Sequence, residues 1–299
     1  MIYGRAIGYP VSAVLSVPYE GLFALACNSI NSTLEIFTVS LLIILMVSLL
    51  LRKSRTFDGA LLFGLLVIHA LNTSGDLISW RLAGEPGEVA LFFTTLGNFS
   101  TYFFGALTYS CFALFVYHTI THRTMPQRIS GKILAGSIIA IGLVNLGLLI
   151  SNALGSGLLY TLDATNEFTW GPLRSVPDNL VLLQLVLLLP LVLVEHDTSL
   201  KETFLSFMLF AGLPIVVVVV ENFFPTLMLL YPSVAISLLL IYISMQPEQE
   251  RALLQKELEL SQNRVKLLMG QIEPHFIFNS LLSIQELSKD APPPGTNRP

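Results

Sequence analysis

Charged residues are scarce in this chain: Asp, Glu, Lys and Arg make up 12% of its 299 residues, about half the share found in a typical soluble domain. Cysteine is scarce as well, since the chain holds only Cys27 and Cys111. Two cysteines exclude a disulfide-stabilised secreted scaffold, and the low charge excludes an ordinary cytosolic enzyme. Hydrophobic residues instead reach 53% and the mean hydropathy is +0.71, too apolar for intrinsic disorder. The composition therefore predicts a protein of the lipid bilayer.

Apolar runs of membrane-spanning length occupy residues 33–245. An α-helix needs about 20 apolar residues to cross the ~30 Å hydrocarbon core of a bilayer. Seven runs approach this length, and the fifth, which contains Pro190, is short. They are residues 34–51, 57–80, 91–117, 133–150, 179–194, 204–224 and 226–244. We predict an all-α fold, a polytopic seven-helix transmembrane bundle followed by a cytoplasmic helix with a short coiled coil.

Lysine and arginine are shared unevenly between the two sides of this bundle. Loops rich in these residues stay on the cytoplasmic side of a membrane. One side carries Arg5, Arg81 and Arg174, whereas the other carries Arg52, Lys53, Arg55, Arg123, Arg128, Lys132 and Lys201. We therefore expect a multi-pass protein of the cell membrane with its N-terminus outside and its C-terminal tail in the cytoplasm. The net charge of -4 gives no reason to expect a nucleic-acid partner.

Residues 1–32 allow three interpretations. Arg5 precedes an apolar stretch that ends in Ala-Leu-Ala at residues 24–26, the pattern of a cleaved signal peptide. Two prolines and Glu20 weaken that interpretation, so an eighth span or a segment lying in the membrane interface is at least as consistent. Cys27 lies near the expected outer surface and Cys111 in the inner half of the third run, so the two are not expected to pair.

Charge returns abruptly after Met245, with twelve charged residues between Gln246 and Asp290. Residues 246–290 form a separate domain. Within it, mostly apolar residues recur at alternating steps of four and three, the spacing of the contact seam of a coiled coil. The seam is Leu254, Leu258, Ser261, Val265, Leu268 and Ile272. We predict a parallel coiled-coil homodimer. The alternative is a helix lying on the membrane, which the near balance of Glu with Lys and Arg disfavours. Residues 291–299 are predicted to be a flexible, proline-rich end.

The seam leads into the segment QIEPHFIFNSL at residues 271–281. Pro274 lacks a backbone N–H and presses on the carbonyl of Gly270, so the helix is expected to kink before His275. His275 and Asn279 lie four residues apart on one helix face, where the amide can hold one ring nitrogen and leave the other free. An unprotonated imidazole nitrogen is a nucleophile suited to attack on phosphorus. The alternative is a structural histidine in an amphipathic helix.

This segment resembles the phosphoacceptor helix of LytS-like sensor histidine kinases, whose motif reads approximately Gln-Ile-x-Pro-His-Phe-Leu-Phe-Asn-x-Leu. The match comprises Gln271, Pro274, His275, Phe276, Phe278 and Asn279, with Ile277 in place of leucine. The resemblance, which covers residues 246–290, implies that His275 is autophosphorylated from ATP with Mg²⁺ and passes the phosphoryl group to an aspartate of a response regulator. Pro274 and Asn279 would complete the catalytic segment. Because no ATP-binding domain follows Ile284, we expect a truncated chain that holds no cofactor and is inactive alone.

Polar side chains gather in the expected outer half of the bundle. Ionisable groups are costly inside a bilayer, so these residues are expected to face the bundle interior. Asp76 and Glu221 favour a cationic or hydrogen-bond-donating ligand, arriving from outside or within the membrane. The candidate ligand-binding residues are Asn72, Asp76, Asn98, Tyr102, Asn145 and Glu221, with Asp163 and Trp170 from the outer loop. The alternative is that these side chains only bond the helices to one another.

The function that the sequence favours is the receptor portion of a two-component sensor histidine kinase. One alternative is a transporter or channel with a coiled-coil tail, in which Asp76 and Glu221 bind the transported cation. Another is a receptor whose tail docks a partner helix without phosphoryl transfer. His118 and His122 have the spacing of metal ligands, but no third ligand is evident, so we predict no metal site.

Overall fold

The computed structural model describes residues 18–51, 57–121, 129–163, 165–194, 201–224, 227–271 and 274–289. The chain divides into two compact units, Met1–Met245 and Gln246–Pro299. This division falls at the residue where the charged tail begins in the sequence.

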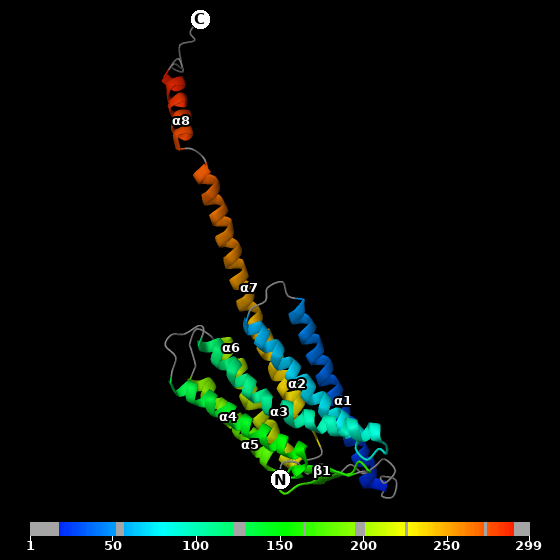
Figure 1. The fold of residues 1–299 in the computed structure, drawn as a ribbon. Helices are drawn as coiled ribbons and strands as arrows, with labels where there is room; N and C mark the ends of the chain where they lie inside the picture. Colours follow the sequence, from blue (N-terminus) through cyan, green and yellow to red (C-terminus); the bar gives the residue numbers. More distant parts are fainter. Residues whose placement is uncertain are drawn as a thin grey trace. The chain divides into compact units, whose positions relative to one another are not determined.

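Long helices make up the described part of the first unit, apart from one short β-hairpin (Figure 1). The all-α fold predicted from the sequence is therefore confirmed. A short π-helical turn, η2 (Asn152–Ser156), extends the fourth helix. The helices are α1 (Pro18–Leu50), α2 (Phe57–Leu82), α3 (Glu88–Thr121), α4 (Ile129–Ser151), α5 (Val176–Val194), α6 (Lys201–Phe223) and the first part of α7 (Leu230–Gln271).

Among the described residues, six helices are long and apolar enough to cross a membrane. Large apolar side chains such as Ile44 and Val216 are 65% and 59% exposed on these helices, as expected where lipid surrounds a bundle. The length and composition of these helices indicate a helical membrane protein. The six candidate spans are Cys27–Leu50, Phe57–Leu82, Glu88–Thr119, Ile129–Ser156, Val176–Leu193 and Phe204–Glu221.

The seventh predicted span is shorter than the other six. Its apolar helix covers Leu230–Gln246, because residues 227–229 form an irregular link before α7 rather than part of the helix. The seven-helix count and the orientation in the membrane stay predictions.

The first helix begins earlier than the sequence predicts. α1 runs from Pro18 to Leu50 without a break, so it contains no boundary at residues 32 and 33. Proline suits the first turn of a helix, where its missing N–H would have no partner, and no second proline follows before Leu50. Residues 18–32 are therefore the first turns of the same helix as the first span, and residues 1–17 lie outside the described residues. Cys27 and Cys111 are both free.

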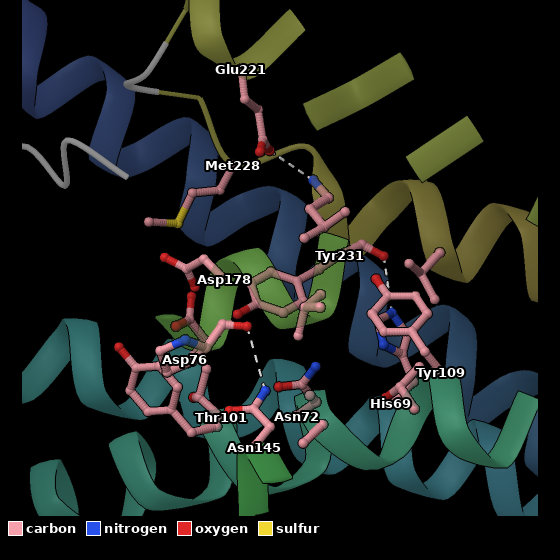
Figure 2. Close-up of a pocket in the computed structure, with 18 of the residues that line it drawn as sticks. His69, Asn72, Asp76, Thr101, Tyr109, Asn145, Asp178, Glu221, Met228 and Tyr231 are labelled. Atoms are coloured by element: carbon pink, nitrogen blue, oxygen red, sulfur yellow. Dashed lines mark hydrogen bonds between the residues drawn. The ribbon is translucent and has the colours of Figure 1, made fainter. Parts of the chain in front are cut away.

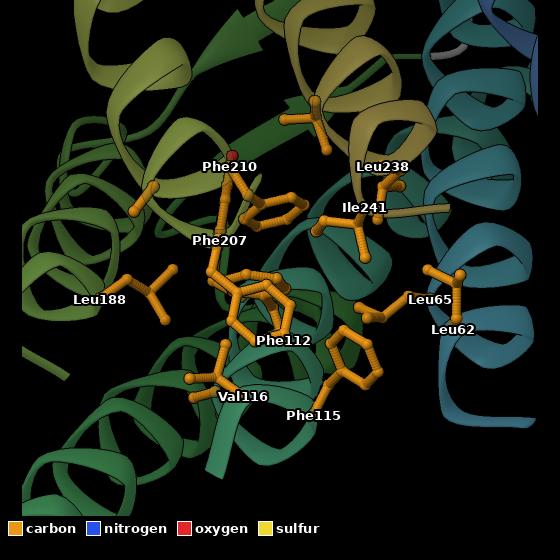
Figure 3. Close-up of a cluster of buried hydrophobic side chains, with 14 of the residues drawn as sticks. Leu62, Leu65, Phe112, Phe115, Val116, Leu188, Phe207, Phe210, Leu238 and Ile241 are labelled. Atoms are coloured by element: carbon orange, nitrogen blue, oxygen red, sulfur yellow. The ribbon is translucent and has the colours of Figure 1, made fainter. Parts of the chain in front are cut away.

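Aromatic rings fill the centre of the bundle (Figure 3). Phe112 and Phe115 of α3 meet Phe207 and Phe210 of α6, and all four side chains are almost fully buried. The rings of Phe112 and Phe210 stack with their centroids 3.6 Å apart. Lipid tails are as apolar as these side chains, so close packing and not the hydrophobic effect holds membrane helices together.

Glycines bring the backbones of α2 and α3 into close contact. A Cβ atom added at Gly97 would lie 2.6 Å from the carbonyl oxygen of Gly75. One added at Gly75 would lie 2.7 Å from the Cβ atom of Ser100. Small residues at such crossings are typical of membrane helix pairs, because they let the backbones approach.

Replacing Gly97 with alanine should therefore push α2 away from α3 and destabilise the bundle by about 1–3 kcal/mol, the usual cost of overpacking. Gly64→Ala is the matched control, since a Cβ atom on this α2 glycine meets nothing within 4 Å. Thermal unfolding in detergent should give a lower melting temperature for Gly97→Ala and no decrease for Gly64→Ala. Equal melting temperatures for the two variants would contradict the close contact.

The second unit consists of the remainder of α7, which ends at Gln271, and of α8 (Pro274–Lys289). Pro274 is the first residue of α8, a position that favours proline. In α7 the seam residues Leu258 and Val265 are 60% and 48% exposed, so their apolar surface is accessible in a single chain. Pairing of two chains along this seam stays a prediction, and Ile272, its last member, lies outside the described residues.

Candidate functional site

A β-hairpin between α4 and α5 forms one wall of the candidate site. β1 (Tyr160–Leu162) pairs antiparallel with β2 (Phe168–Trp170). Asp163 holds the turn, since its carboxylate accepts hydrogen bonds from the Thr165 hydroxyl at 2.7 Å and from the backbone N–H of Glu167 at 2.8 Å. These bonds, that of the Thr165 hydroxyl foremost, keep the pKa of Asp163 below its ordinary value. Asp163 is thus occupied within the hairpin.

Asn166 fastens the hairpin turn to the link between α2 and α3. Its backbone has φ 61°, a left-handed conformation that asparagine tolerates better than most residues. Its buried Nδ2 donates to the carbonyl oxygens of Leu82 and Glu85, at 2.6 and 3.2 Å, and to Thr94 Oγ1 at 3.1 Å. The two N–H groups of this amide are shared among three acceptors, and they link segments that are distant in the sequence.

Stacked aromatic rings join the hairpin to α3. Tyr102 of α3 stacks on Tyr160 with a centroid separation of 5.6 Å, and Tyr160 stacks on Phe168 at 5.2 Å. Phe168 then meets Trp170 edge to face at 4.7 Å. This series of rings fixes where Trp170 lies relative to the helices.

A pocket lined by both polar and apolar groups opens among these elements (Figure 2). Helices α2, α3, α4, α5, α6 and α7 contribute side chains to it, as does β2. Its empty volume, including the open mouth, is about 880 Å³. The polar and aromatic residues that line it are His69, Asn72, Asp76, Thr101, Tyr102, Thr108, Tyr109, Asn145, Trp170, Asp178, Glu221 and Tyr231.

Six of the eight candidate ligand-binding residues line this single pocket: Asn72, Asp76, Tyr102, Asn145, Trp170 and Glu221. The structure thus brings together residues from α2, α3, α4, α6 and the hairpin. The other two candidates do not line it. Asn98 is buried and donates to the carbonyl of Thr94, one turn earlier in α3, and Asp163 closes the hairpin turn as described above.

Glu221 connects the pocket to the start of α7. Its Oε1 accepts hydrogen bonds from the backbone N–H groups of Leu229 at 2.6 Å and Leu230 at 2.9 Å. The first N–H groups of a helix have no partner within the helix, and a carboxylate also complements the positive end of the helix dipole. Asn31 of α1 accepts a further bond from the N–H of Met228, at 3.0 Å. The N-terminus of α7 is therefore held by side chains of α6 and α1.

His69 binds α7 from another direction. Its Nε2 lies 3.0 Å from the carbonyl oxygen of Tyr231, which accepts, so Nε2 carries the proton of that bond. Nδ1 of the neutral ring is then an acceptor, and no group in the described part of the chain donates to it. The same holds for Oδ1 of Asn72 and for Oε2 of Glu221. All three side chains are more than nine-tenths buried.

Sequence reasoning missed His69, Tyr109, Asp178 and Tyr231 as pocket residues. His69, Asn72 and Asp76 recur at spacings of three and four, so a polar stripe along α2 was readable from the sequence. Asp178 directly precedes the predicted fifth span, which starts at residue 179, whereas α5 begins before it, at Val176. No sequence signal distinguishes Tyr109 and Tyr231 from tyrosines that only pack.

Residues 274–281 of the segment that resembles a phosphoacceptor helix belong to α8. His275 and Pro274 belong to this helix, but their side chains lie outside the described residues. Phe276 and Phe278 are 67% and 63% exposed, and Asn279 is exposed as well. The role of His275 as phosphoacceptor stays a prediction.

Of the histidine pair considered for metal binding, the structure describes only His118. Nδ1 of His118 lies 3.1 Å from Oδ1 of Asp58, so this ring binds a carboxylate of α2. His122 is outside the described residues. Where the structure describes the chain, no group of three His, Cys, Asp or Glu residues is arranged to hold a metal ion.

Comparison with known proteins gives no relative: no family model, no curated protein and no solved structure matches this chain.

Proposed function

We propose that this chain is the receptor portion of a sensor histidine kinase of the LytS-like kind. In this proposal a ligand in the bundle pocket controls autophosphorylation of His275 in a homodimer, and the phosphoryl group then passes to a response regulator. The alternative, a transporter or channel, accounts for acidic residues in a membrane pocket but gives no role to the segment around His275.

One observation carries the proposal: α7 begins at the pocket and continues as a single helix to Gln271. Tyr231 and Val234 in its first turns line the pocket, and Glu221 caps its first N–H groups. Only two residues separate its last residue from Pro274, where the helix that contains His275 begins. A change at the pocket therefore acts on the helix that leads to His275.

The proposed chemistry uses the neutral imidazole as a nucleophile. One ring nitrogen of His275 attacks the γ-phosphorus of Mg²⁺-bound ATP, a P–N bond forms, and the P–O bond to ADP breaks. The phosphoryl group then moves from nitrogen to an aspartate oxygen of the response regulator, and the ring is restored. ATP and Mg²⁺ would be held by an ATP-binding domain joined to this chain, while Asn279 would orient the ring.

Labelled ATP tests the proposal. The chain is joined through Asp290 to the second bundle helix and ATP-binding domain of a LytS-like kinase, and γ-labelled ATP is added. We expect label on the protein that is lost in acid and stable in base, as a phosphohistidine requires. Absence of label from a folded fusion protein that binds ATP would contradict the kinase function, and flux of cations through liposomes containing the chain would support a transporter.

A further inference from the structure

The pocket has an excess of hydrogen-bond acceptors. Its three buried polar atoms without a partner among the described residues are Nδ1 of His69, Oδ1 of Asn72 and Oε2 of Glu221. Each is an acceptor, given that Nε2 of His69 donates to Tyr231. Buried acceptors without partners are costly, so these atoms call for a group with several hydrogen-bond donors.

The pocket is also acidic. Asp76 of α2, Asp178 of α5 and Glu221 of α6 all line it, and Figure 2 shows all three among the lining residues. Asp76 and Glu221 are only 1% and 4% exposed. No lysine or arginine is among the described residues that line the pocket. Carboxylates buried within membrane helices need a positive counterpart or a network of donors.

Aromatic residues complete the lining. Tyr102, Tyr109, Trp170 and Tyr231 come from α3, β2 and α7. The faces of such rings attract ammonium groups and also pack against apolar carbon. The pocket therefore offers both a site for a cation and a surface for the apolar remainder of a ligand.

We infer that the pocket binds a small organic compound that carries a primary ammonium group beside an apolar or aromatic group. A primary ammonium supplies three N–H donors and one positive charge, which matches the unpartnered acceptors and the carboxylates together. A quaternary ammonium supplies the charge without the donors, and an alcohol supplies a donor without the charge. That this compound is the signal rests on the proposed function, whereas its binding does not.

Two sources provide this chemistry: a free amine, or the ethanolamine headgroup of a phospholipid. Binding of 2-phenylethylamine to the whole chain would be measured by titration calorimetry in nanodiscs made from phosphatidylcholine alone and from phosphatidylcholine with phosphatidylethanolamine. Equal affinity in the two lipids assigns the site to free amines. Weaker binding in the presence of phosphatidylethanolamine assigns it to the headgroup, because the headgroup then competes.

Matched probes test the ammonium itself. The whole chain in dodecyl maltoside should bind 2-phenylethylamine at least about tenfold more tightly than its alcohol analogue or its trimethylammonium analogue, because charge-assisted N–H donors are the strong ones. Binding of either analogue as tightly as the amine, no binding of the amine, or equivalent binding of Mg²⁺ alone in its place would overturn the inference.

Variants locate the binding. Asp76→Asn and Glu221→Gln should each weaken amine binding at least about tenfold, since each removes a buried negative charge. Glu88→Gln, at an exposed carboxylate of α3 that does not line the pocket, should bind as the unchanged chain does. Size-exclusion elution and melting temperature establish folding, and Asp178→Asn replaces any variant that does not fold. Unaltered affinity in folded pocket variants would overturn the site. This experiment needs neither ATP nor His275, so its failure is separate from failure of the kinase function.

Discussion

Replacing His275 with glutamine should abolish labelling of the fusion protein by γ-labelled ATP, a loss of at least about a hundredfold. Glutamine keeps a polar side chain of similar reach but has no nucleophilic nitrogen, because its amide lone pair is delocalised. Asn279→Ala should slow labelling by about tenfold to a hundredfold, since the amide orients the ring and does not react itself. Both effects are measured as initial rates at saturating ATP.

The control for this pair is His122→Gln, which removes a histidine from a different part of the chain. It should label at the rate of the unchanged protein. An acid-labile label on His275→Gln would show that the phosphoacceptor is another residue. The role predicted for His275 from the resemblance of residues 271–281 would then be wrong. Labelling of Asn279→Ala at the full rate would contradict orientation of the ring by the amide. It would leave the role of His275 as phosphoacceptor unaffected.

Replacing Glu221 should separate the two roles that the structure gives it. Glu221→Ala removes the acceptor for two backbone N–H groups at the start of α7 and should lower stability by about 2 kcal/mol or more, because caps contribute about 1 kcal/mol and buried unpaired donors cost more. Glu221→Gln keeps a carbonyl oxygen able to accept these bonds. It should retain most of the stability but lose the charge that faces the pocket.

Thermal unfolding in detergent distinguishes these variants, with Glu88→Gln as the control. Glu88 is an exposed carboxylate in the first turn of α3 and does not line the pocket. We expect a clear fall in melting temperature for Glu221→Ala, and at most a small one for Glu221→Gln and for Glu88→Gln. A melting temperature of Glu221→Ala equal to that of the unchanged chain would show that the cap contributes nothing to holding α7.

Membrane helices were readable from the sequence because lipid imposes a length and a composition on them. Each of the first six apolar runs coincides with a helix of spanning length, and only Leu51 and Phe224, at the ends of two runs, lie outside the helices. The bounds were less predictable: α1 begins at Pro18, sixteen residues before the first run, because polar residues such as Asn28 and Asn31 interrupt the apolar run but not the helix. α7 begins later than predicted, because residues 227–229 of the seventh run form the link that Glu221 and Asn31 hold.

The pocket was predictable in part, since buried polar groups in a membrane are costly and therefore informative. The expected depth of these residues in the membrane predicted one candidate site that contains Asn72, Asp76, Asn145 and Glu221. All four line the pocket. The hairpin was not predicted, because strands of three residues are too short to show alternation. Trp170, the hairpin residue that lines the pocket, was predicted as an aromatic loop residue and not as part of a strand.

The dependence of His275 phosphorylation on pocket occupancy tests the central claim most directly. The fusion protein with γ-labelled ATP would be titrated with 2-phenylethylamine, and the initial labelling rate followed in the unchanged protein and in Glu221→Gln. We expect the rate of the unchanged protein to change severalfold as the pocket fills, in either direction, and that of Glu221→Gln to stay constant over the same range. A rate independent of the amine at concentrations that fill the pocket, or an equal change in both proteins, would contradict control of His275 from this pocket.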